Sequence, residues 1–414
     1  MKKSLLAVAA LTAFAGAAQA QSSVTVYGLL DAGLIGGNEQ INGGKKGQVK
    51  QTGNAFGANA ESTSRLGFKG TEDLGGGKSA FFTIEVAIAP NGDQNYSTGA
   101  SANRQTFVGL KQNGLGWGAF GTQYTNIHNQ VSATDPGATN NVGGNVIYAT
   151  STLPSTSIGS GVNGNVDAYT LRIGNTLFLA SDSFAGFQGN LAYTLNASSA
   201  TETQNPPAGT VPTGYTGGAV NKTGWQAGLN YTLSKFYATA NYQSFKVTNP
   251  WTSTAATAAD VYKAGGVGAT VGAPVVIGSG NAAQTGSNDR SNQGYVAATY
   301  DFGILKAYAQ WITRKDTSVI NPLAYVKRQA QQIGVRSYIT PTVEGWASVG
   351  NGKYTYYGAS TSATVNGWQA GLNYYLSKRT NLYAIYGGTN TSTSAYTNLS
   401  YGQQNYALGV RHTF

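Results

Sequence analysis

The 414-residue sequence contains no Cys, one Met and only two His, His128 and His412. The lack of Cys excludes disulfides, thiolate-bound zinc or iron–sulfur sites and cysteine nucleophiles. Two His are too few for a histidine-rich metal site and leave little from which to build a Ser-His-Asp triad. Charged residues make up only 10% of the chain, whereas an average soluble domain has about 25%. These shortages point away from an ordinary cytoplasmic enzyme, and no EF-hand pattern indicates a calcium site.

The first twenty residues have the pattern of a secretory signal. Lys2 and Lys3 precede an apolar stretch over 5–15, and Ala18-Gln19-Ala20 forms a small-x-small cleavage site. We therefore expect cleavage after Ala20 and a single mature domain over 21–414. The apolar stretch is about half of the ~20 residues that a spanning helix needs, and no later run is longer. An exported chain of this kind is either soluble beyond the inner membrane or a barrel in the outer one.

The chain is rich in Gly, with 57 residues, and in aromatics, with 26 Tyr, 14 Phe and 6 Trp. Its main pattern is alternation with a period of two. Trp225, Leu229 and Leu233 fall on one face of an extended segment, with Gln226 and Asn230 on the other. The octapeptide GWQAGLNY of this segment recurs further along the chain. Apolar and polar faces that alternate in this way are typical of strands between hydrocarbon and a wet lumen.

Sixteen segments of this kind are present, joined alternately by short and long connections. Such barrels have short periplasmic turns and long extracellular loops, so the pattern predicts an all-β, antiparallel transmembrane barrel. Periodicity alone also accommodates fourteen or eighteen strands. The expected strands are 24–34, 62–71, 78–88, 103–111, 116–125, 168–180, 186–196, 223–233, 235–247, 292–302, 303–315, 329–339, 342–351, 365–375, 380–390 and 403–414, with 35–61, 126–167 and 248–291 among the long connections.

Five segments, at 22–34, 62–77, 103–110, 376–386 and 409–414, resemble in order and spacing the Gram-negative trimeric porins of β-proteobacteria. This resemblance implies a 16-stranded barrel, three barrels per assembly and a long third loop folded into the lumen. It also implies passive diffusion of small hydrophilic solutes and ions, without catalysis or a cofactor. The terminal Phe414 would belong to the signal read by the barrel assembly machinery.

Strand phase predicts a basic inner wall. Arg65 and Lys69 fall on the lumen face of their strand, because the apolar residues between them must face lipid. Arg104 shares a face with Thr106, and Arg172 lies among polar residues of its own strand. The resemblance implies that such arginines form a ladder at the narrowest point of the pore, and that they act together rather than as solvated residues near a rim.

The acidic side of the expected constriction is sparse. Gln123 stands where the family usually has an arginine, so one positive charge of the wall is lost. The third loop, 126–167, has no Lys or Arg, and its acids are Asp135 and Asp167. The resemblance implies that loop carboxylates face the basic wall, although Asp135 precedes Pro-Gly and also suits ordinary turn chemistry. A positive excess at the constriction favours anions.

Other functions are compatible with parts of this sequence. A solute-specific porin and a non-conducting structural or adhesive barrel remain alternatives, since the loops are long. The pI of about 9.4 suggests nucleic-acid binding as another function. The basic residues are dispersed along the chain, however, and form no contiguous basic stripe. Expected partners are two further copies of the chain, outer-membrane lipid and lipopolysaccharide, with Lys45-Lys46 and Lys327-Arg328 as loop pairs suited to its acidic groups.

Overall fold

The computed structural model describes residues 23–42, 48–90, 103–149, 168–200, 218–248, 289–318, 325–357, 360–393 and 400–414. These residues form seventeen antiparallel strands of one sheet and one helix, α2. The bounds are β1 Ser23–Asn42, β2 Gln48–Ala58, β3 Arg65–Gly75, β4 Lys78–Ala87, β5 Asn103–Gln112, β6 Gly116–Tyr124, α2 Asn126–Thr134, β7 Arg172–Ser181, β8 Phe187–Ala200, β9 Gly218–Leu233, β10 Phe236–Thr248, β11 Asp289–Asp301, β12 Lys306–Ser318, β13 Tyr325–Thr340, β14 Val343–Tyr356, β15 Ala363–Tyr375, β16 Thr380–Thr391 and β17 Ser400–Thr413.

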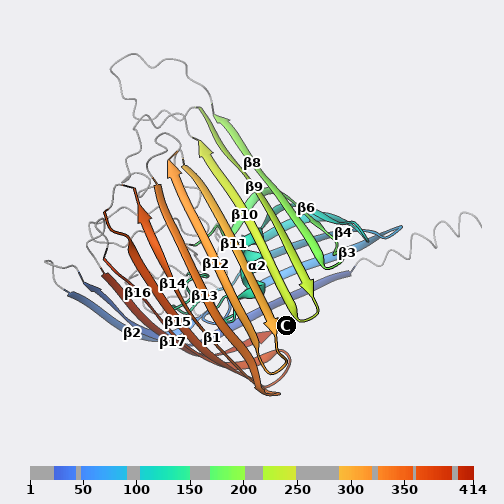
Figure 1. The fold of residues 1–414 in the computed structure, drawn as a ribbon. Helices are drawn as coiled ribbons and strands as arrows, with labels where there is room; N and C mark the ends of the chain where they lie inside the picture. Colours follow the sequence, from blue (N-terminus) through green and yellow to red (C-terminus); the bar gives the residue numbers. More distant parts are fainter. Residues whose placement is uncertain are drawn as a thin grey trace, which may run out of the picture.

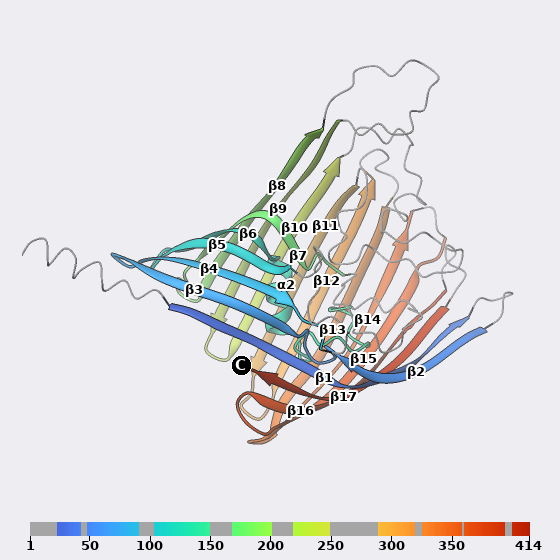
Figure 2. The same cartoon turned by 180° about the vertical axis from the view of Figure 1, so that it is seen from behind.

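The sheet closes on itself as a 16-stranded barrel, as the sequence predicts. β1 pairs with β3 over its first part, Ser23–Leu29, and with β2 over Ala32–Asn42. β2 and β3 therefore share one position in the wall, which reconciles seventeen strands with sixteen positions. Figures 1 and 2 show the tilted strands from opposite sides, with α2 between the walls in both views.

One expectation about this region is wrong. The segment 35–61 was expected as a long connection, but most of it is strand, in the second half of β1 and in β2. Its many Gly and Asn residues hide the alternation, and the backbone ladder between β1 and β2 forms regardless of side chain. The wall strand is interrupted where Asn59 takes a left-handed conformation, with φ of 70°.

The barrel closes at the seam between β1 and β17. The register runs from Leu29 opposite Thr413 to Asn42 opposite Ser400. Beyond it, the backbone N–H of Gly28 donates to the carbonyl of Phe414 and the N–H of Phe414 donates back, both at 3.1 Å. The last residue of the chain is thus part of the closing ladder. No helix among the described residues has the length and apolarity needed to cross a membrane.

The predicted alternation of faces is confirmed. Trp225, Leu229 and Leu233 are exposed on the outer surface, whereas Gln226 and Asn230 are buried inside. Exposed apolar side chains cover the outside of nearly every strand, and buried amides and hydroxyls occupy the inside. This inverted distribution is stable where the outer medium is hydrocarbon.

The helix α2 was not anticipated within the third connection. Thr125 caps it, and its side-chain oxygen accepts a hydrogen bond from the backbone N–H of His128 at 3.3 Å. Its apolar positions, Ile127 and Val131, are fully buried against inner-wall residues such as Tyr295 and Ile312. The strongly polar composition of the connection concealed this short apolar face. Residues 150–167 lie outside the described residues.

We predict that Gly33→Ala weakens the seam. A Cβ at Gly33 would lie 2.2 Å from the carbonyl oxygen of Leu408 and 2.5 Å from the Cα of Gly409, so backbone must move to admit it. The expected loss is about 1–3 kcal/mol of unfolding free energy, measured by urea unfolding of the refolded barrel. Gly189→Ala is the control, since its nearest neighbour would be the Ser181 hydroxyl at 3.9 Å. Equal stability of the two variants would contradict this account.

Candidate functional site

Three arginines of the inner wall gather around one carboxylate and one tyrosine, although they come from β3, β5 and β7. Arg104 donates from Nε to Glu85 at 2.7 Å and from Nη2 to the Tyr124 hydroxyl at 2.5 Å. Arg65 Nη1 lies 4.0 Å from the same Glu85 oxygen. The Arg172 guanidinium lies 5.7 Å from the centroid of the Tyr124 ring. We call these five residues the arginine cluster; it contains three guanidinium groups and a single carboxylate, which Arg65 and Arg104 share.

Arg104 reaches the lumen through a β-bulge. The β4–β5 ladder runs through the pairs Ile84–Thr106 and Glu85–Gln105 and then shifts, which leaves Arg104 without an opposite residue. Ile84 is exposed on the outer face, so Thr106 faces outward as well. The expectation that Arg104 shares the face of Thr106 is therefore wrong. The extra residue of the bulge turns the arginine inward, where it is buried.

Glu85 belongs to the candidate site but was not among the site residues expected from the sequence. The alternation of apolar residues over 80–88 puts Glu85 on the lumen face, but only third-loop carboxylates were expected to face the arginines. The order of β3, β4 and β5 places Glu85 between the strands of Arg65 and Arg104. Its other oxygen accepts a hydrogen bond from the Tyr27 hydroxyl at 3.1 Å. The sequence did contain a signal for this contact. Consecutive strands joined by short turns lie side by side, so their inward side chains are neighbours in the barrel.

The remaining wall candidates lie apart from the cluster's hydrogen bonds. Lys69 is exposed, with its Nζ 5.3 Å from the centroid of the Tyr27 ring. Gln123 is buried and donates to the carbonyl of Ala119 at 3.2 Å, so this amide serves the local backbone. Asp167 and the cleavage-site residue Ala20 lie outside the described residues.

His128 of α2 packs against the Tyr124 ring of the arginine cluster. Its ring centroid lies 4.3 Å from that of Tyr124, and its Nδ1 forms a 3.0 Å hydrogen bond with the Tyr169 hydroxyl. Burial, followed by the nearby charges of Arg172, Arg104 and Arg65, holds the pKa of His128 well below its ordinary value of 6.5. The imidazole is therefore neutral near neutral pH and adds no charge to the cluster.

Asp135 occupies a different place from the one expected. Its carboxylate accepts hydrogen bonds from Asn145 Nδ2 at 2.8 Å, from Gln332 Nε2 at 3.1 Å and from the backbone N–H of Thr139 at 2.7 Å. Gln332 belongs to β13, and Asp135 is only 3% exposed. Burial raises the pKa of this carboxyl above its usual range. Asp135 therefore connects the loop to the wall by hydrogen bonds and also serves the local turn, as its Pro-Gly context suggests. Its carboxylate does not face the arginine cluster.

Inward amides of the wall hold the rest of the described loop. Gln226 accepts from the backbone N–H of Asn126 at 2.8 Å, and Gln369 donates to the carbonyl of Val142 at 2.6 Å. Arg328 donates from Nη2 to the carbonyl of Val146 at 2.5 Å. Residues 125–149 therefore contact inward side chains of β9, β13 and β15.

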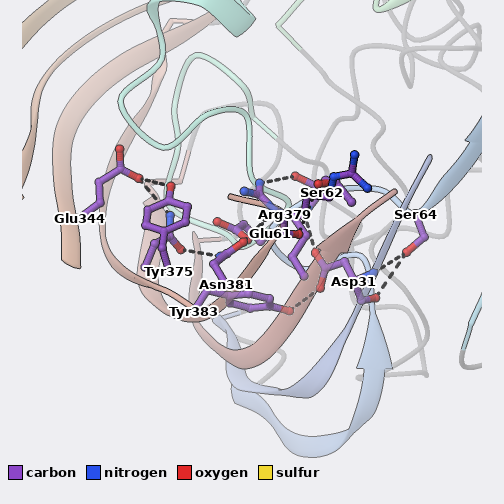
Figure 3. Close-up of polar contacts among 12 residues, drawn as sticks. Asp31, Glu61, Ser62, Ser64, Glu344, Tyr375, Arg379, Asn381 and Tyr383 are labelled. Atoms are coloured by element: carbon purple, nitrogen blue, oxygen red, sulfur yellow. Dashed lines mark hydrogen bonds and ion pairs between the residues drawn. The ribbon is translucent and has the colours of Figure 1, made fainter. Parts of the chain in front are cut away.

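A second polar group lies on the inner wall near the seam, where Asp31, Glu61 and Glu344 carry carboxylates (Figure 3). Tyr383 donates its hydroxyl to Asp31 at 2.5 Å, and Asn381 donates to Glu61 at 3.0 Å. Glu61 and Glu344 also face arginines, Arg411 at 3.4 Å and Arg336 at 3.6 Å. The acids of the interior are thus mostly neutralised by local partners, whereas the arginine cluster keeps an excess of positive charge.

Comparisons with known proteins agree with this architecture. A family profile described as Gram-negative porin matches residues 7–394. An outer membrane porin protein of Bordetella pertussis is 31% identical over 205 residues, 48% of this chain and 49% of the relative. Outer membrane porin protein 32 of Delftia acidovorans is 42% identical over 113 residues, 27% of this chain and 29% of the relative. The chain thus spans about half, or less, of the length of these curated relatives.

Solved structures with the same fold match almost the whole chain. The anion-selective porin from Comamonas acidovorans has a TM-score of 0.61 at 20% identity, covering 95% of this chain and 100% of the other. OmpT, an outer membrane protein of Vibrio cholerae, has a TM-score of 0.57 at 12% identity, covering 95% and 98%. At these identities the likeness concerns the fold.

We predict that His128 makes the barrel less stable in acid. The unfolded chain binds a proton here below about pH 6.5 while the folded protein does not, so stability falls as the pH drops through that value, by about 1.4 kcal/mol per pH unit. His128→Gln, which keeps a hydrogen-bonding group for Tyr169, removes this contribution. Thermal unfolding in detergent at about pH 7.5 and about pH 5 measures it; an identical acid shift in both proteins would refute the assignment.

Proposed function

Because the chain belongs to the Gram-negative porin family, we propose that it is an outer-membrane channel through which small hydrophilic solutes and ions diffuse passively, with a preference for anions. Residues 1–20 are removed on export, and 21–414 form a single barrel domain. The terminal Phe414, on the closing seam, is part of the signal for the barrel assembly machinery. A family in which the barrel encloses an aqueous path requires no chemical step and no cofactor.

The observation that carries the anion preference is the charge imbalance of the arginine cluster. Three guanidinium groups face one carboxylate, and the Nη1 of Arg172 has no hydrogen-bond partner among the described residues. This nitrogen is buried, so Arg172 acts on a passing anion through its charge rather than through direct contact. The loop acid that was expected to balance these charges, Asp135, is instead engaged by Asn145 and Gln332.

The cluster acts through its field. Low-dielectric walls focus the potential of fixed charges into a narrow aqueous path, which raises the local concentration of anions and lowers that of cations. Passage also requires that binding stay weak enough for release. The negative charge of Glu85 offsets part of the positive charge of the cluster, which keeps anion binding weak. Its ion pair with Arg104 also holds that side chain against the wall.

We predict that Arg172→Gln reduces the anion preference. Arg172 is the most suitable position because no ion pair joins it to Glu85 among the described residues, so its removal leaves no carboxylate orphaned. One unit charge at about 6 Å contributes about 0.7 kcal/mol in water, so the anion-to-cation permeability ratio should fall roughly threefold. The measurement is the reversal potential of single channels under a KCl gradient.

Two matched variants complete this experiment. Lys378→Gln removes one exposed cation at a short turn, and Asp135→Asn neutralises the buried loop acid; neither should alter the ratio appreciably. A cation-preferring wild-type channel would overturn the proposal, as would equal effects of Arg172→Gln and Lys378→Gln. The absence of any conductance would favour the structural or adhesive barrel.

We also propose that three copies assemble into a homotrimer. The outer surface carries exposed apolar side chains on all sides, so part of it can be covered by neighbouring barrels as readily as by lipid. Conductance in steps of three equal levels, together with a trimer mass from light scattering corrected for detergent, is the expected result. Single-level openings from a particle with the mass of one chain would contradict it.

A further inference from the structure

Five cations lie on the outer, lipid-facing side of five consecutive strands, β10 to β14. They are Lys246, Arg290, Lys315, Lys327 and Lys353, here called the outer cation band. The burial pattern settles their direction: each alternates with inward residues, as Lys246 does with buried Phe245 and Val247. The pair Lys327-Arg328 shows the same rule. Lys327 faces outward, whereas Arg328 is buried and donates to the loop, so the two do not form the exposed loop pair expected from the sequence.

The ladder register brings these like charges together. Lys246 is directly opposite Arg290 across β10 and β11, and Lys315 is directly opposite Lys327 across β12 and β13. Side chains directly opposite each other on one face have Cβ atoms about 5 Å apart, and like charges there are destabilising. Lys353 is opposite Gln329, one step diagonally from Lys327. Two repulsive pairs and a fifth cation therefore stand side by side.

The described acids of these strands do not relieve this repulsion. Asp316 is buried on the inner face, where it pairs with Arg314 at 3.0 Å, and Glu344 is buried inside as well. Asp301 lies at the other end of β11, at a short turn. Among the acids whose side chains are described, none faces the band, and a ligand from outside the protein can supply the missing negative charge.

The depth of the band indicates which ligand is present there. Lys246 follows the outward Tyr242 by four residues, and Lys315 follows the outward Trp311 by four, in both cases toward the end of the long connections. Outward Tyr and Trp mark the membrane interface, and four residues add about 13 Å along a tilted strand. The band is therefore level with the headgroups of the outer leaflet. Tyr325 supports Lys315 there, with its ring centroid 4.3 Å from Nζ.

We propose that the outer cation band binds the phosphate groups of an outer-leaflet lipid headgroup, the chemistry that lipopolysaccharide presents at this depth. Phosphate supplies a dense negative charge and several acceptor oxygens, which neutralise adjacent lysines and arginines. Each cation near an anionic surface adds to the attraction. The band is separate from the arginine cluster, which faces the lumen, so this inference does not depend on channel activity.

The test uses the purified full-length barrel in neutral detergent and diphosphorylated lipid A as the probe. In one variant, all five band residues are changed to Gln. The control variant carries Lys78→Gln, Lys111→Gln, Lys235→Gln, Lys378→Gln and Arg379→Gln, which removes five exposed cations near the short turns. We expect the apparent affinity of the band variant to fall at least about tenfold and that of the control to change less than about twofold.

Two further arms make the outcome decisive. A band variant in which the four lysines are changed to Arg keeps the charge and should retain binding, and its folding shows that these four positions tolerate substitution. Lipid A without phosphate should bind the native protein poorly, and inorganic phosphate at millimolar concentration should not displace the phosphorylated lipid. Unchanged affinity in the Gln variant, binding that ignores the lipid's phosphates, or full displacement by inorganic phosphate would each overturn the proposal.

Discussion

The structure depends on one constraint: a backbone surrounded by hydrocarbon must satisfy all its N–H and C=O groups within the protein. A sheet does so only when it has no free edge, and the seam between β1 and β17 removes the edge. β1 contributes most to this closure because it pairs with β17 on one side and with β3 and β2 on the other. Phe414 extends this ladder through two backbone hydrogen bonds with Gly28.

Closure of the sheet creates an interior, and the polar side chains buried there need hydrogen-bond partners. Wall amides such as Gln226, Gln332 and Gln369 are buried, and their partners are backbone and side-chain groups of the third connection. An unsatisfied buried amide costs about 1–3 kcal/mol, so wall and loop stabilise each other. The same hydrogen bonds fix the position of residues 125–149 relative to the wall.

The electrostatic character of the interior follows from this arrangement. Most inner carboxylates have arginine, amide or tyrosine partners nearby, including Asp135, which belongs to the fastening of the loop. Glu85 alone is shared by Arg65 and Arg104. Positive charge is thus concentrated in one part of the wall even where basic and acidic groups elsewhere compensate each other. On the outer surface, the cations of β10 to β14 also need nearby negative charge, and the proposed source is the lipid phosphates of the membrane.

Much of this was visible in the order of the residues. Alternation with a period of two determined the fold class and the lumen-facing side of Arg65, because a strand between lipid and water must segregate its side chains. It predicted sixteen strands but also accommodated fourteen or eighteen. Where the alternation was masked by Gly and Asn, as over 35–61, the reading failed, since backbone pairing makes no demand on side-chain type. The helix α2 was not predicted for a related reason. Ile127 and Val131 are two apolar residues in a polar loop, and they form a buried helix face only because the barrel wall packs against them.

By itself, the sequence determined what depends on neighbours along the chain: strand, face, turn and the sign of the charge. Only the tertiary structure decided what depends on neighbours across it. A single-residue bulge in β5 turned Arg104 to the side opposite its apparent phase, and strand order brought it to Glu85 while the path of the loop took Asp135 to Gln332. The physical reason is that electrostatic and hydrogen-bond energies fall off over a few ångströms, so they are set by distances that exist only once the barrel has closed.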